Sequence, residues 1–258
     1  MSFFFFGDMG SGEPDQLKVA HAMKDNINNK TMFICGLGDN IYENGCGSVD
    51  DPLFETHFER PYSIISDKIP FYMCLGNHDY GYDDCGDHMA QVEYGRVSQK
   101  KGGKWYMPDK YYTFRKGDIE FFVLDTNFDE PNYNDNLNDQ LNYFKNKIKK
   151  SKAKWKIVYG HHTWRSVGGH GAADDKLEGF LSSLLKHVNF DMYMCGHDHN
   201  KQVINLTMHN KDITLIVCGT GGKVYDDISD YGSLDENSDL IFSSNNLGYG
   251  YFVQRGKK

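Results

Sequence analysis

Five short polar blocks constrain the fold of this chain more than any other feature. Each follows an apolar, strand-like run and carries side chains that bind metal ions; the blocks are Gly7–Gly10, Gly38–Tyr42, Gly76–Asp79, Val158–His161 and Gly196–His199. Sheets of α/β proteins place ligand sites beyond the carboxyl ends of their strands, so side chains far apart in sequence can meet there. The glycine in each block permits close backbone approach. The pattern predicts one metal site built from five strand ends.

Apolar runs alternate with helix-period segments along the chain. Strands are expected at 2–7, 32–37, 71–75, 111–115, 119–125, 155–159, 192–195, 201–206, 213–218 and 249–254, with helices from Pro14 and at 53–62, 138–149 and 174–187. The segment 224–246 is long and polar and is expected to be a loop. This rhythm predicts an α/β fold, a four-layer sandwich of two packed mixed β-sheets flanked by helices, with residues 1–258 forming one domain.

Charge and hydropathy restrict the possible partners. The formal net charge of −8 argues against a nucleic-acid partner, which normally requires a basic face. No apolar stretch reaches the roughly 18 residues of a membrane span, and 3–6 is too short for a signal-peptide core. We therefore expect a soluble chain that is a monomer without a membrane partner, and its compartment stays open. Cys46 and Cys85 lie in polar loops after two of the blocks, and a disulfide between them is one alternative.

The five blocks together resemble the purple acid phosphatases, most closely the tartrate-resistant acid phosphatase type of the metallophosphoesterase superfamily. Tyr42 is the most telling residue, because the wider superfamily generally lacks this tyrosine. The resemblance covers nearly the whole chain and includes Leu124–Thr126. The chain departs from the family at Met9, where a tryptophan is frequent, and at His162–Thr163, where an aromatic residue and a proline are common.

The resemblance implies a dinuclear metal centre with two different ligand sets. The first set is rich in anionic oxygen and consists of Asp8, Asp39, Tyr42 and His199. The second is mostly neutral and consists of Asn77, His161 and His197, with Asp39 bridging the two. Hard anionic oxygen suits Fe(III), and the neutral set suits a divalent ion such as Fe, Zn or Mn. A tyrosinate requires a strong Lewis acid beside it, because free tyrosine has a pKa near 10.

Three further residues are expected to act on the substrate. His78 resembles the family's non-ligand histidine near the substrate phosphate, where it could stabilise phosphate charge or protonate the leaving group. Asp79 could hold the His78 imidazole in one tautomer. His170 resembles the family's second outer histidine. His162 lies next to a ligand and could touch substrate or simply pack.

The resemblance implies an acid phosphatase that hydrolyses phosphomonoesters by attack of a metal-bound hydroxide. Two alternatives stay open. The chain could be a phosphodiesterase or a metallophosphoesterase specific for nucleotides or phosphoproteins, which the surrounding loops would decide. It could also be a non-catalytic binding relative, although none of the seven expected ligands is missing.

Overall fold

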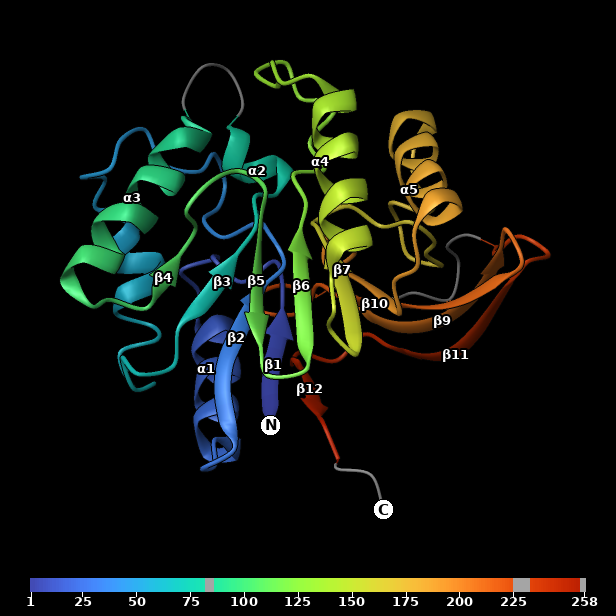
Figure 1. Cartoon of the computed structure of the whole chain (residues 1–258). Helices are drawn as coiled ribbons and strands as arrows, with labels where there is room; N and C mark the ends of the chain where they lie inside the picture. Colours follow the sequence, from blue (N-terminus) through green and yellow to red (C-terminus); the bar gives the residue numbers. More distant parts are fainter. Residues whose placement is uncertain (82–85, 225–232, 256–258) are drawn as a thin grey trace.

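Two β-sheets form the core of the computed structural model, which describes residues 1–81, 86–224 and 233–255 (Figure 1). The five-stranded sheet has the order β12 (Gly250–Val253), β1 (Ser2–Phe6), β2 (Thr31–Gly36), β3 (Phe71–Met73) and β4 (Trp105–Tyr106). The seven-stranded sheet has the order β11 (Ser238–Ser244), β9 (Lys201–Met208), β10 (Lys211–Cys218), β8 (Met192–Cys195), β7 (Trp155–Tyr159), β6 (Ile119–Val123) and β5 (Tyr112–Lys116).

Both sheets are mixed, and their parallel strands position the site. In the first sheet β1, β2, β3 and β4 run parallel, while β12 pairs antiparallel with β1. In the second, β6, β7, β8 and β10 run parallel, and β5, β9 and β11 are antiparallel to their neighbours. The carboxyl ends of the parallel strands are where ligand sites form. The predicted fold class of two mixed sheets flanked by helices is confirmed.

The helices are α1 (Pro14–Asn26), α2 (Asn77–Tyr80), α3 (His88–Lys101), α4 (Leu137–Lys150) and α5 (Asp175–His187). At α3, α4 and α5 the side chain of the residue before the helix accepts a hydrogen bond from a backbone N–H group of the first turn. Pro14 opens α1, where its missing N–H is not needed. The carboxylate of Asp174 accepts hydrogen bonds from Lys176 and Leu177 at the start of α5. Figure 1 shows α4 and α5 lying together beside the seven-stranded sheet.

Alternation along the inner strands divides the core into two clusters. On β6, Phe121 and Val123 belong to the cluster that contains the β1 phenylalanines, whereas Phe122 packs with the α4 and α5 side chains. The same alternation separates Met194 from Tyr193 on β8. Successive strand side chains point to opposite faces, so each central strand contributes to both the inter-sheet and the helix-covered layer.

Several elements differ from those expected. The segment expected as a helix at 53–62 forms a short π-helix, Glu55–Glu59, followed by turns. The helix α3, the one-turn helix α2 and the two-residue strand β4 were not expected. The segment expected as a loop at 224–246 contains the strand β11, and its residues 225–232 lie outside the described part of the chain. Within the described residues, no helix is long and apolar enough to cross a membrane.

Candidate metal centre

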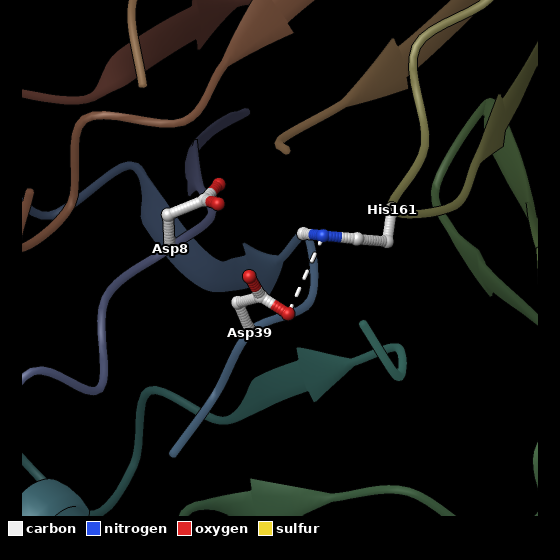
Figure 2. A group of neighbouring side chains, drawn as sticks. All are labelled: Asp8, Asp39 and His161. Carbon is white, nitrogen blue, oxygen red and sulfur yellow. Dashed lines mark ion pairs between the residues drawn. The ribbon is translucent and has the colours of Figure 1, made fainter. Parts of the chain in front are cut away.

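Side chains from five strand ends meet at one place between the two sheets. Asp8 follows β1, Asp39 follows β2 and His161 follows β7; their donor atoms all lie within 4.8 Å of one another, and all three residues are buried (Figure 2). Asn77 opens α2 directly after β3, and the histidine pair follows β8. The structure thus gathers all seven predicted ligands: Asp8, Asp39, Tyr42, Asn77, His161, His197 and His199.

The phenol oxygen of Tyr42 is the centre of one half of the cluster. It lies 2.9 Å from Asp39 Oδ2, 3.1 Å from Asp8 Oδ1 and 3.2 Å from His199 Nε2. His199 Nε2 also lies 3.3 Å from Asp8 Oδ1. These four side chains are the anionic set that the resemblance implies.

His161 is the centre of the other half. Its Nε2 lies 3.0 Å from Asn77 Oδ1, 3.1 Å from His197 Nδ1 and 3.4 Å from Asp39 Oδ1. Asp39 therefore faces one half with each of its carboxylate oxygens, which is the geometry a bridging ligand needs. The identity of the ions that the two halves bind stays a prediction.

The hydrogen bond at the back of His161 fits a metal ligand. His161 Nδ1 lies 2.9 Å from the carbonyl oxygen of Leu37. A carbonyl only accepts, so Nδ1 carries the proton, and the neutral ring presents a lone pair at Nε2. That lone pair converges with the oxygens of Asn77 and Asp39. Lone pairs that converge in a buried place match the chemistry of a bound cation, and the outward N–H bond is the usual support of a ligating histidine.

The two buried carboxylates of the cluster favour a positive charge beside them, as the pKa shifts of their neighbours indicate. Burial raises the pKa of Tyr42 well above its usual value, and the Asp39 and Asp8 carboxylates raise it further. Burial opposes the charged form of His161, but the pull of Asp39 and Asp8 outweighs it and raises the pKa of this histidine. Burial likewise opposes ionisation of Asp8, but hydrogen bonding to His199 and the charge of His161 hold its pKa low.

Three of the seven residues have a backbone conformation that L-residues rarely adopt. The φ angles are +57° at Asp8, +51° at Asp39 and +70° at His197. Such left-handed positions cost free energy and concentrate at functional sites. Two glycines allow the blocks to approach so closely: a Cβ atom at Gly76 would lie 2.2 Å from Asp39 Oδ1, and one at Gly196 would lie 2.4 Å from Asp8 Oδ2.

Asp79 occupies a different place from the one predicted. Its buried carboxylate accepts hydrogen bonds from the backbone N–H groups of Asn40, Ile41 and Gly76 and from the side chain of Gln91. It therefore fastens the second block to the third, and we assign it a positioning role in place of the predicted control of the His78 tautomer.

The His78 imidazole is oriented from the second block. His78 Nδ1 lies 2.7 Å from the carbonyl oxygen of Glu43, and Nε2 lies 3.9 Å from Asp39 Oδ2. The ring packs 4.5 Å from the Tyr42 ring, measured between centroids. His78 thus stands at the rim of the cluster, where its Nε2 faces the bridging carboxylate.

Two more histidines pack against the neutral half. The His170 ring lies 3.9 Å from the His197 ring, and the His162 ring lies 4.6 Å from it, between centroids. Burial lowers the pKa of His162 well below its usual value, and His161 and His170 lower it further. Cys46 is buried, and its possible disulfide partner Cys85 lies outside the described residues.

Four residues that contact the members of this cluster or hold Asp79 were not predicted from the sequence. Asn40 and Gln91 hold Asp79, Thr126 contacts His162, and Lys223 lies over the Tyr42 ring. Asn40 and Thr126 lie in or beside the quoted motifs, which was the one available signal. Gln91 lies on α3, 12 residues after Asp79, and Lys223 lies far from Tyr42 in the sequence, so no local pattern indicates either contact.

Known proteins are similar to this chain in sequence and in fold. The calcineurin-like phosphoesterase family matches residues 1–201. Purple acid phosphatase 7 of Arabidopsis thaliana is 32% identical over 248 residues, which cover 87% of this chain and 71% of that protein. The chain belongs to the purple acid phosphatase family. Tartrate-resistant acid phosphatase type 5 of Oryctolagus cuniculus is 31% identical over 67% of the chain, and the match spans 56% of that relative.

This chain is also similar to a solved structure that is not described as a phosphatase. GAP50, described as the anchor in the inner membrane complex of Plasmodium, superimposes with a TM-score of 0.78 at 25% identity. The match covers 97% of this chain and 80% of GAP50. The fold of this chain is therefore also the fold of a protein that is described as an anchor.

Proposed function

We propose that the chain is a dinuclear metal-dependent acid phosphatase that hydrolyses phosphomonoesters. The observation that carries the proposal is the position of Asp39, whose two carboxylate oxygens face Tyr42 and His161 in separate halves of one cluster. The first half, with Asp8, Tyr42 and His199, would hold Fe(III). The second half, with three neutral side chains, would hold a divalent Fe, Zn or Mn ion.

Two bound cations would polarise the phosphoester and lower the pKa of a water molecule at the site. The protein itself contributes the orientation of the surrounding groups. Leu37 holds the His161 ring through Nδ1, and the Asp79 carboxylate holds the Asn40 backbone beside Asp39. These contacts fix the ligand positions before any substrate arrives.

His78 is the residue we propose for proton transfer. Its Nδ1–H donates to the Glu43 carbonyl, so the proton at this nitrogen is fixed. The other nitrogen, Nε2, faces the bridging carboxylate and can hold a proton or release it to a leaving oxygen.

The match to GAP50 supports a second candidate, a binding protein without catalysis. The retained cluster argues for catalysis, because a pure anchor has no need of seven converging donors and three strained ligand positions. Activity decides between the two candidates.

The test is hydrolysis by protein loaded with iron and zinc, measured with an aryl phosphomonoester, a bis-aryl phosphodiester and a phosphopeptide. We expect hydrolysis of the monoester, and a fall of about 10³-fold or more in Asp39→Asn, because stabilisation by the cations is worth several kcal/mol. Faster hydrolysis of the diester supports the phosphodiesterase alternative. Metal-loaded protein that is inert toward all three substrates contradicts the proposal and favours the binding candidate.

A further inference from the structure

A cavity of 170 Å³ adjoins the neutral half of the candidate metal centre. Its wall includes both polar and apolar side chains, among them His162, His170, His197, Asp174, Ala173 and Leu177. A cavity of about 150 Å³ holds a benzene molecule. This one therefore has room for a group about as large as one six-membered ring.

The hydroxyl of Thr126 determines which nitrogen of His162 carries the proton. Thr126 Oγ1 accepts hydrogen bonds from the backbone N–H groups of His161, at 3.2 Å, and His162, at 3.1 Å. The same oxygen lies 2.9 Å from His162 Nδ1. A hydroxyl has two lone pairs and one hydrogen. Both lone pairs are used by the backbone, so the hydrogen is donated to Nδ1, and the neutral ring carries its own proton on Nε2.

His162 thus offers a fixed N–H donor beside the cluster. Its ring lines the cavity and packs 4.6 Å from the His197 ring and 5.1 Å from the His161 ring, between centroids. Within the described residues, His162 Nε2 makes no hydrogen bond. A donor held in one tautomer next to the reacting centre is suited to recognise an oxygen atom of the substrate.

We propose that this cavity receives the alcohol portion of the phosphomonoester and that His162 is a specificity-determining residue that donates Nε2–H to a hydroxyl oxygen. The class of substrate it favours is a phosphate ester of a small polyol or a single sugar ring. Ala173 and Leu177 in the lining would suit the carbon skeleton of such an alcohol, and the histidines and Asp174 would suit its hydroxyl groups. This inference rests on the proposed phosphatase function.

The experiment compares kcat/KM for glycerol 3-phosphate and propyl phosphate, which differ by two hydroxyl groups on the same carbon chain. His162→Phe keeps the ring and removes the donor. We expect the ratio of kcat/KM for glycerol 3-phosphate to kcat/KM for propyl phosphate to fall by about fivefold, the effect of one net hydrogen bond. His187→Phe, exposed at the far end of α5, is the matched control and keeps the wild-type ratio.

A second variant tests the tautomer of His162 and changes no residue that lines the cavity. Thr126→Val removes the hydroxyl, and long-range ¹⁵N–¹H correlation spectra of the metal-free protein report the proton position on each imidazole. We expect the Nε2–H form of His162 in the wild type and a mixture of tautomers in Thr126→Val, whereas Thr126→Ser keeps the wild-type form. A wild-type His162 protonated on Nδ1 overturns the inference.

The possible outcomes distinguish a failure of this inference from a failure of the proposed phosphatase function. If the wild type hydrolyses propyl phosphate and His162→Phe leaves the ratio unchanged, the role of His162 is wrong and the phosphatase function stands. If metal-loaded wild type hydrolyses neither ester nor any aryl phosphate, the proposed function fails, and the inference fails with it.

Discussion

The ammonium group of Lys223 lies 3.7 Å from the centre of the Tyr42 ring. Its Nζ also lies 2.7 Å from Glu43 Oε1, so the cation is held in place over the phenol. A cation against the face of an aromatic ring stabilises negative charge in that ring. Lys223 therefore supports the phenolate form that Tyr42 needs as a metal ligand, against the burial and the two carboxylates that disfavour it.

Removing this cation should change the colour of the iron-loaded protein. In Lys223→Met the phenolate is less stabilised, so its charge-transfer band should move to lower energy by roughly 1–2 kcal/mol, the size of a partly desolvated cation–π contact. Visible absorption measures the shift. Lys223→Arg keeps a cation over the ring and should leave the band close to the wild-type position; a band that stays in place in Lys223→Met contradicts the assignment.

His78 should be needed for turnover and not for metal binding. We expect His78→Ala to lower kcat by about 10²–10⁴-fold, the range of a lost acid–base group, with metal content unchanged. His187→Ala is the matched control, because it removes an exposed histidine at the end of α5; it should stay within about threefold of the wild type. Wild-type turnover in His78→Ala would remove this residue from the mechanism.

The fold was predictable wherever apolar residues run without interruption. The strands β7 and β8 begin and end where the sequence predicts, since both are short, largely apolar runs preceded by a charged residue and followed by a glycine. The helix α3 was missed because polar and small residues cover its inner face; Gln91, Gly95 and Ser98 are buried there. The strand β11 was missed because it is a largely exposed edge strand, with Ile241 59% exposed, within a polar stretch.

The site was predictable as far as backbone topology determines it. Strand ends bring Asp8, Asp39 and His161 together whatever their separation in sequence, so the motif order predicted the cluster. Side-chain direction within a loop is set by tertiary partners. The carboxylate of Asp79 turns toward Asn40 and Gln91, and the tautomer of His162 depends on Thr126, 36 residues away. Neither contact leaves a local pattern.

A buried histidine outside the candidate metal centre, His88, should make the free energy of unfolding depend on pH. His88 stacks on the Tyr80 ring, and burial, helped by Lys110, lowers its pKa. Below its usual pKa near 6.5, the unfolded chain takes up a proton that the folded chain refuses, so stability falls as the pH falls.

His88→Phe should therefore weaken the loss of stability between pH 7 and pH 5, by up to about 1.4 kcal/mol per pH unit. Urea unfolding of metal-free protein at several pH values measures this slope, and His187→Phe controls for the loss of an exposed histidine. Equal slopes in wild type and His88→Phe would show that His88 takes up a proton equally in both states.

The central claim is that seven side chains surround two cations with Asp39 between them. Anomalous diffraction from crystals grown with iron and zinc, recorded at both absorption edges, tests this most directly. We expect two peaks on opposite sides of the Asp39 carboxylate, the iron peak beside Tyr42 and the zinc peak beside His161. A single peak, or no peak within ligand distance of Asp39, would contradict the account.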